Sequence, residues 1–370
     1  MARIVEPNLD ILLFNRLKKP LDAEMPLLDK LREMHNFLVQ AVRPESRSDG
    51  QELLAKLCRA VSIYIGQMSL FLYLSRVQPR YYDRTKPMAY LRAPLDLQQK
   101  IVAAMAIGDH DLVRNLLPEN LKSPEWRSLI FGSPLSFAIC QGDANVVRTV
   151  LQCMSQYGAH GMNLLEVLID DYYGESWSKT SAMAYAITCR RPKVLDVIKE
   201  FQERFGKPLS RKAYNTLLTL AICSGEVDLV RVVFRLKVNG GVRITLNHIT
   251  EAAQSRNEDV MLAIITSPGM SVNKAYSDTS PLLAAVRTGD VHMVRAVLKA
   301  GAEIDMKVGG RTALVEAMTA GKDVIFQTLL DHGAQLPPRA VWPQVPRKQN
   351  SKQKGVREVL ENEQRRRSRR

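Results

Sequence analysis

The side chains that most often carry out chemistry, histidine and cysteine, are scattered along this chain rather than gathered in a motif. No histidine lies in an HExxH pattern or at metal-ligand spacing from a cysteine, and the six are His35, His110, His160, His248, His292 and His332. The five cysteines include no CxxC pair, and they are Cys58, Cys140, Cys153, Cys189 and Cys223. An odd number without a pairing pattern favours a reducing compartment over a disulfide framework.

Other candidate sites have a plainer structural interpretation beside the chemical one. Ser178-Lys179-Thr180 lacks the glycines with which a phosphate loop cradles its ligand. His332 could contact a ligand, but a capping role in its repeat is favoured, and buried packing is favoured for Cys140 and Cys223. Asp170 to Tyr173 is either a solvated loop or a partner contact. We therefore predict no enzyme activity, no cofactor and no metal site, with a catalytic site hidden in residues 1–95 or in the insertion described below as a minor hypothesis.

The chain repeats itself. The segments PLSFAICQGDANVVRTVL (134–151), LLTLAICSGEVDLVRVVF (217–234) and PLLAAVRTGDVHMVRAVL (281–298) each show a helical apolar period, a two-residue turn and a second helical period. Weaker copies begin near residues 100, 183, 249 and 311. The turn falls at Gly108, Gly142, Arg190, Gly225, Arg256, Gly289 and Gly321, at intervals of 34, 48, 35, 31, 33 and 32 residues. The long interval predicts an insertion at about 153–180.

One small residue holds the same place in every copy. The residue four positions before each turn is alanine, at positions 104, 138, 186, 221, 252, 285 and 317. A small side chain in register predicts close approach of two helices, because a larger group would overpack the contact. Glycine at five of the turns accepts a positive φ, and an acidic residue after it would meet the positive end of the second helix.

Two of the copies resemble a known family. Ser280 to Ala285, Gly289-Asp290 and Leu298 to Asp305 are similar to one ankyrin repeat, and Gly310 to Leu314 with Leu329 to Ala334 resemble the next. The resemblance is strong over residues 270–336 and degenerate over 97–265. Arg190-Arg191-Pro192 departs from the family's Gly-Asp turn. Such repeats stack into a solenoid in which each copy contacts its neighbours.

The predicted fold is all-α: an ankyrin-like helical-repeat solenoid of about seven repeats, with an N-terminal helical domain and a disordered basic tail. The predicted domains are residues 1–95, a capping domain with helices near 27–42 and 53–74, residues 96–337, the array, and residues 338–370, the tail. The uncharged run 60–75 is shorter than a membrane span and predicts a buried helix. No signal peptide is expected, and an intracellular location, cytoplasmic or nuclear, is predicted.

Positive charge is concentrated at the C-terminus. Residues 339–370 hold eleven Lys/Arg against three Glu, out of a net charge of +14 for the whole chain. Low apolar content and clustered charge predict disorder in isolation, although 352–366 has the spacing of a short helix. The arginines at the end are an import signal, a nucleic-acid contact or a solubilising end: Arg365, Arg366, Arg367, Arg369 and Arg370.

The predicted function is a non-catalytic scaffold that binds a protein partner on the concave face of the array. The resemblance implies that the fingers between repeats, and the helix ends beside them, contact the partner. By position these residues are Lys274, Tyr276, Asp278, Thr279, Arg287, Thr288, Lys307, Arg311 and Thr319. Tyr and Arg are the side chains that most often anchor interfaces. The alternative is a nuclear regulator that contacts nucleic acid through the arginine-rich tail.

Overall fold

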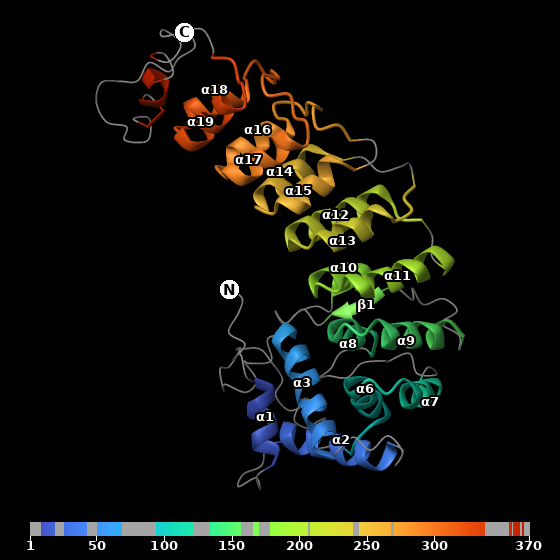
Figure 1. The fold of residues 1–370 in the computed structure, drawn as a ribbon. Helices are drawn as coiled ribbons and strands as arrows, with labels where there is room; N and C mark the ends of the chain where they lie inside the picture. Colours follow the sequence, from blue (N-terminus) through green and yellow to red (C-terminus); the bar gives the residue numbers. More distant parts are fainter. Residues whose placement is uncertain are drawn as a thin grey trace, which may run out of the picture. The chain divides into compact units, whose positions relative to one another are not determined.

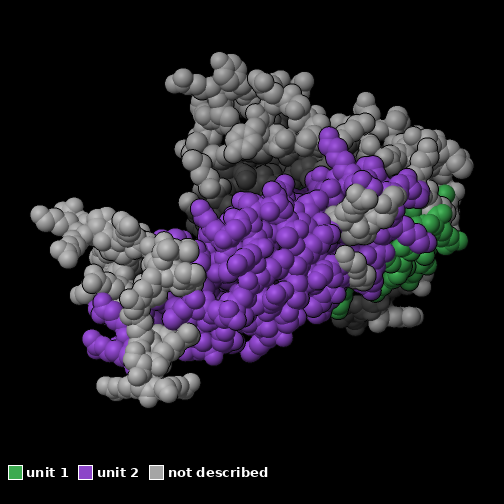
Figure 2. Space-filling model, turned by 90° about the horizontal axis from the view of Figure 1, so that it is seen from above, with its two compact units in different colours: residues 1–207 green, residues 208–370 purple. Residues whose placement is uncertain are grey.

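The computed structural model describes most of the chain, with gaps. The described residues are 9–18, 26–42, 50–68, 94–120, 134–156, 166–169, 178–205, 208–239, 244–267 and 270–336, then 355–356, 358–362 and 365. Their contacts divide the chain into two compact units, residues 1–207 and 208–370 (Figure 2). This division lies inside the predicted array, between its third and fourth copies, so the predicted domain boundaries remain a separate proposal.

Helix–turn–helix pairs are the building block of both units (Figure 1). Unit 1 holds α6 (Leu97–Ile107) with α7 (His110–Asn120), α8 (Pro134–Gln141) with α9 (Ala144–Gln156), and α10 (Ala182–Thr188) with α11 (Pro192–Phe205). Unit 2 holds α12 (Arg211–Ser224) with α13 (Val227–Phe234), α14 (Leu246–Gln254) with α15 (Glu258–Ile265), α16 (Pro281–Thr288) with α17 (Val291–Lys299), and α18 (Ala313–Thr319) with α19 (Asp323–Asp331). Within each unit the first helices of successive pairs contact one another, and so do the second helices. The predicted all-α repeat solenoid is confirmed.

All the predicted turn positions have the same left-handed backbone. The glycines have φ values of 76° at Gly108, 83° at Gly142, 74° at Gly225, 82° at Gly289 and 67° at Gly321. Arg190 and Arg256 occupy the equivalent places in the other two pairs, with φ of 55° and 54°. The left-handed region disfavours side chains with a Cβ, so these two arginines adopt it at a conformational cost that glycine does not have. The third copy therefore keeps the common turn despite its departure from Gly-Asp.

The residue after the turn connects the second helix to its surroundings in two ways. Asp143 and Asp290 accept hydrogen bonds from backbone N–H groups at the start of their own second helices, at 2.9 Å from Asn145 N and His292 N. Arg191 instead donates to Cys140 O of the preceding pair at 2.9 Å. Asn257 does both, because its Oδ1 accepts from Asp259 N at 3.0 Å while its Nδ2 donates to Gly225 O at 2.8 Å. The bonds to Cys140 O and Gly225 O satisfy carbonyl groups at the end of a first helix, which have no hydrogen-bond partner within that helix.

The alanine register marks the tightest packing in each pair. The seven alanines lie on the first helices α6, α8, α10, α12, α14, α16 and α18, and each is 0% exposed. Because the first helices of neighbouring pairs contact one another, no space remains for a longer side chain at these places. The shared slot inferred from the sequence is confirmed.

The described residues before the first pair include the helices α1 (Leu9–Leu17), α2 (Pro26–Ala41) and α3 (Gly50–Met68). Leu31, Met34 and Leu38 are fully buried at the helical spacing that the sequence predicted. Helices α2 and α3 pack against α6, as expected for a domain on the first repeat, and α3 continues onto α8. Ala60 and Val61 of the uncharged run are buried in α3, and residues 69–75 lie outside the described residues. Among the described residues, no helix has both the length and the apolar character needed to cross a bilayer.

Two segments differ from the expectation. The insertion contains an antiparallel hairpin of β1 (Glu166–Ile169) and β2 (Ser178–Ser181), with Glu166 opposite Ser181. The strands were not predicted because each has only four residues and neither EVLI nor SKTS alternates between apolar and polar side chains. In the tail, the described residues between 355 and 365 are helical rather than disordered, and Val356 and Leu360 are buried. A Cβ atom at Gly355 would lie 2.5 Å from an Asp323 carboxylate oxygen, so this tail segment packs at the start of α19.

Enlarging an alanine of the shared slot should destabilise the array. Ala285 is 0% exposed between the flanking first helices, so Ala285→Leu should lower the free energy of unfolding by about 1–3 kcal/mol. Ala320→Leu is the matched control, because Ala320 is exposed at the end of α18. Urea denaturation measures both. Equal free energies of unfolding for the two variants would show that the slot is not tightly packed.

The tail helix should stabilise unit 2 through its two buried side chains. Val356→Ser combined with Leu360→Ser should lower the free energy of unfolding by roughly 2 kcal/mol or more, since burial of each side chain is lost. Glu358→Ser with Asn362→Ser is the control, because both of these side chains are exposed. Thermal unfolding followed by circular dichroism measures both variants. Equal melting temperatures for the two double variants would contradict the packing of the tail.

Candidate functional site

Two short fingers project between the pairs of unit 2. In the first, Tyr276 and Thr279 exchange two backbone hydrogen bonds of 2.8 Å, and in the second, Val308 and Arg311 exchange bonds of 3.0 and 3.1 Å. Gly309 and Gly310, between Val308 and Arg311, have φ of 59° and 78°, which suits a tight hairpin that needs positive φ at both central positions. Each finger is therefore a small closed hairpin placed directly before a first helix.

The base of each finger is fixed to the loop of the following pair. Asn273 Oδ1 accepts from Glu303 N at 2.7 Å, and its Nδ2 donates to Gly301 O at 3.3 Å. Asp305 repeats this arrangement one copy later and accepts from Gln335 N at 3.0 Å. Backbone groups of adjacent loops are thus joined through one side chain per repeat, which orders the fingers relative to one another.

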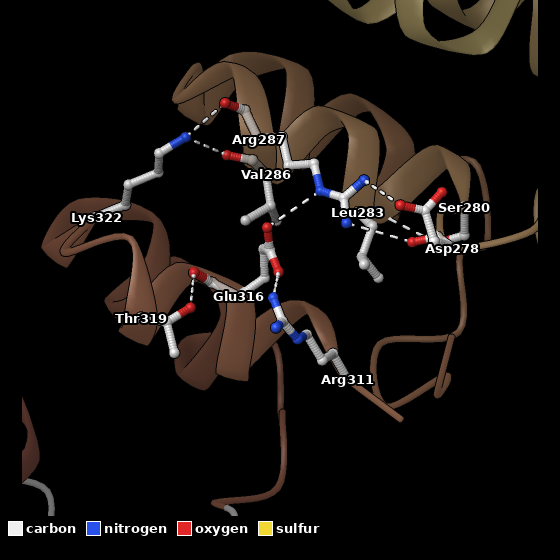
Figure 3. A network of polar contacts seen from close by, with 9 residues as sticks. All are labelled: Asp278, Ser280, Leu283, Val286, Arg287, Arg311, Glu316, Thr319 and Lys322. Atoms are coloured by element: carbon white, nitrogen blue, oxygen red, sulfur yellow. Dashed lines mark hydrogen bonds and ion pairs between the residues drawn. The ribbon is translucent and has the colours of Figure 1, made fainter. Parts of the chain in front are cut away.

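A chain of charged side chains crosses from the first finger to the second (Figure 3). Arg287 of α16 lies 3.1 Å from Glu316 Oε1 and donates to Asp278 O at 3.3 Å. Glu316 also accepts from Arg311 at 3.5 Å, so one carboxylate lies between two guanidinium groups. Glu316 is only 14% exposed whereas Arg311 is 62% exposed. The glutamate therefore orients both arginines while part of Arg311 stays open to solvent.

Lys322 connects the last pair to the C-terminal end of α16, beside this network (Figure 3). Its Nζ donates to Val286 O at 2.8 Å and to Arg287 O at 2.7 Å. Burial lowers the pKa of Lys322, while the nearby charge of Glu316 acts in the opposite direction. The ammonium neutralises the negative end of α16 and donates to carbonyl groups that would otherwise lack hydrogen-bond partners.

The predicted partner-binding residues divide into three groups. Exposed side chains are Lys274, Asp278, Arg287, Lys307, Arg311 and Thr319. Tyr276 and Thr288 are half-buried, and the Thr288 hydroxyl donates to Ala285 O at 2.7 Å, which gives it a role in the turn. Thr279 was predicted wrongly, since it is 2% exposed. The hairpin bridge that pairs Thr279 with Tyr276 turns its side chain inward.

Sequence reasoning did not select Glu316 and Lys322, although both hold the network in place. Lys322 had a detectable signal, because it occupies the post-turn position where the better-matching copies have an acidic residue. Glu316 had a weaker one: it is the one charged residue in an otherwise mostly apolar helical segment, five residues after Arg311.

The position two residues before the turn shows which face of the first helices is open. In unit 2 it is occupied by exposed Cys223, Gln254, Arg287 and Thr319. In unit 1 the equivalent Cys140 is buried, because α3 packs on α8 and Gln141 Nε2 donates to Ala60 O at 2.7 Å, whereas Ala106 of α6 is half-buried and Thr188 of α10 is exposed. Buried packing is thus confirmed for Cys140 but was wrong for Cys223. No helix among the described residues makes a comparable contact on this face of unit 2.

Thiol chemistry is not favoured at the buried Cys58 and Cys140. Burial raises the pKa of Cys58 to about 12, and Asp10 adds to this shift. The pKa of Cys140 is raised by its hydrogen bond with Cys189 and by burial. A protonated thiol is a poor nucleophile. His332, assigned to capping from sequence, contacts Thr328 O through Nδ1 at 2.8 Å at the end of α19.

A polar groove of about 650 Å³ lies between the first turns of α12 and α14 in unit 2. Its lining includes Arg211, Lys212, Asn215, Thr216, Thr219 and Asn247. His248 forms part of the wall, accepts from Thr245 N at 3.2 Å through Nδ1, and is buried. Burial lowers the pKa of His248, against an opposing effect of Glu251, and this keeps the ring neutral near pH 7.

Several predicted features lie wholly or partly outside the described residues. Arg365 is exposed in the tail helix, whereas Arg366, Arg367, Arg369 and Arg370 are outside the described range, as is the segment from Asp170 to Tyr173. The import-signal and nucleic-acid hypotheses for the tail stay predictions. Within the described ranges, no cluster of three His, Cys, Asp or Glu side chains is placed to hold a metal ion.

The repeated geometry agrees with a family comparison. A model of ankyrin repeats, in three copies, matches residues 249–339. Residues 249–339 are thus similar to ankyrin repeats. The match confirms the resemblance proposed for 270–336 and adds the copy beginning at 249.

Solved ankyrin repeat domains are similar to the chain at low identity. The ankyrin repeat domain of Bcl-3, described as a unique member of the IkappaB protein family, is 19% identical, with a TM-score of 0.41, covering 55% of this chain and 87% of that one. The human ASB11 ankyrin repeat domain is 18% identical, with a TM-score of 0.43, covering 64% of this chain and 98% of that one. No curated protein sequence matches the chain.

Removing the Lys322 ammonium should loosen the last ankyrin repeat. Lys322→Met leaves the carbonyl groups of Val286 and Arg287 without this donor, so the free energy of unfolding should fall by about 1–2 kcal/mol. Lys307→Met is the control, because Lys307 is an exposed finger residue. Guanidinium denaturation of both variants measures the difference. A Lys322→Met protein as stable as the control would rule out the stabilising role.

Proposed function

We propose that the protein is a non-catalytic scaffold that holds a protein partner on the finger face of unit 2, the surface formed by the two fingers and the exposed side of α12, α14, α16 and α18. The observation that carries the proposal is the ordered charged network of Arg287, Glu316 and Arg311 on an uncovered face. Ankyrin repeats are in general protein–protein interaction modules, which supports a protein as the ligand.

The finger face provides side chains that can anchor a partner at low entropic cost. Tyr276 is half-buried, its hydroxyl lies 2.6 Å from Met270 Sδ, and Lys274 Nζ lies 5.3 Å from its ring centroid. Arg311 is aligned by Glu316 but largely exposed. Side chains that are already oriented lose less freedom on binding, and Tyr and Arg are the common anchors of interfaces.

The N-terminal helices support a restriction of the binding face to unit 2. In unit 1, α3 lies across α6 and α8 and covers the position that is exposed in unit 2. A partner would have to displace α3 to use those helices, and burial of Leu57, Cys58 and Val61 opposes this. The open finger face needs no such rearrangement.

Removal of the two anchors tests the proposal. Full-length protein with Tyr276→Ala and Arg311→Ala should recover its protein partner from cell extract at roughly a tenth of the wild-type level or less, since interface anchors contribute strongly to affinity. His292→Ala with Arg295→Ala is the matched control on the exposed side of α17. Quantitative affinity purification compares the three. The proposal fails if the anchor variant and the control recover the same proteins in the same amounts.

A further inference from the structure

The groove between α12 and α14 has a charge that selects its ligand. Arg211 and Lys212 are both exposed at its edge, and no acidic side chain is among its lining residues. The first turns of two helices lie in the same wall and add positive potential from their N–H groups. We propose that this groove binds an extended acidic segment of the protein partner, an inference that rests on the proposed function.

The remaining lining groups suit a peptide backbone. Thr216, Thr219 and Thr245 bring hydroxyl groups, and Asn247 brings an exposed carboxamide. Asn215 Oδ1 is buried and has no hydrogen-bond partner among the described residues. Buried polar atoms are usually paired. A peptide in the groove would bring N–H and C=O groups within reach of these donors and acceptors, while its carboxylates pair with Arg211 and Lys212.

The wall of the groove is fixed before any ligand arrives. His248 of α14 is buried in this wall and accepts from Thr245 N through Nδ1 at 3.2 Å. Helices α12 and α14 also pack directly against each other, which holds the two sides of the groove together. A groove with fixed walls binds an extended chain at lower conformational cost than one that must first be ordered.

The groove opens onto the rest of the finger face. Thr216, Thr219 and Cys223 follow helical spacing along the same side of α12. Cys223 belongs to the row of exposed positions that continues through Gln254 to Arg287 in the next two pairs. An acidic segment leaving the groove along this row would approach Arg287 and then Arg311, the arginines that Glu316 orients.

An acidic peptide fits these residues better than single-stranded nucleic acid does. Bases bind on such surfaces mainly by stacking on aromatic rings, but the lining residues include no Phe, Tyr or Trp, and the His248 ring is only 2% exposed. Two basic side chains are also few for a polyphosphate backbone. Carboxylates spaced along a peptide need only these two partners and the hydroxyl and amide groups.

The test uses the full-length protein and defined probes. A fluorescent peptide of alternating Glu and Ser is titrated beside its Gln/Ser counterpart and an oligothymidine of similar length, with anisotropy as the readout. Arg211→Glu with Lys212→Glu should weaken binding of the acidic peptide by roughly tenfold or more. Arg295→Glu with Lys299→Glu, both exposed on α17, is the matched charge reversal and should leave binding unchanged. Circular dichroism checks that both variants keep the fold.

Three outcomes would overturn the inference. These are equal affinity for the Glu/Ser and Gln/Ser peptides, equal weakening by the two charge reversals, or preferential binding of oligothymidine through Arg211 and Lys212. Partner recovery that depends on Tyr276 and Arg311 but tolerates Arg211→Glu with Lys212→Glu would reject the acidic groove and leave the scaffold proposal standing. If partner recovery does not depend on Tyr276 and Arg311, the scaffold proposal is rejected instead.

Discussion

The whole array depends on one backbone constraint, the left-handed turn that ends each first helix. At this residue the chain reverses within two positions, and both glycine and arginine adopt the same φ region there. The turn sets the angle between the two helices of a pair, so the alanine four residues earlier always meets the same kind of neighbour. A residue just after the turn can then reach the preceding pair, as Arg191, Asn257 and Lys322 do. The backbone conformation of the turn and the stacking of the pairs are therefore coupled.

The same repeated geometry is used differently in the two units. In unit 1, helix α3 occupies the face of α6 and α8, and Cys140 is buried beneath it. In unit 2 the corresponding face carries Cys223, Gln254, Arg287 and Thr319, all exposed. Covered and open versions of one surface thus occur in a single chain. This contrast supports a binding role for the open face, because the repeat alone would make both faces equivalent.

Much of the fold could be predicted because its signals are local and periodic. The turn residue and the alanine slot were identified from spacing alone, including the turns at Arg190 and Arg256. The pairing of 166–169 with 178–181 was missed because each strand is only four residues long and shows no alternation of apolar and polar side chains. Thr279 was placed wrongly because the bridge to Tyr276 determines its burial. Cys223 was placed wrongly because no helix covers it as α3 covers Cys140. Both depend on tertiary contacts rather than on local sequence. Glu316 escaped notice because its importance comes from two arginines in different segments.

The central claim is that the turn residue must be left-handed even where it is not glycine. The most direct measurement is the difference in free energy of unfolding between Arg256→Gly and Arg256→Ala, in a chain where Arg256 has φ of 54°. In ordinary helical backbone, alanine is the more stabilising of the two residues. The constraint predicts the reverse here, with the glycine variant more stable by about 1 kcal/mol. An alanine variant of equal or greater stability would contradict it.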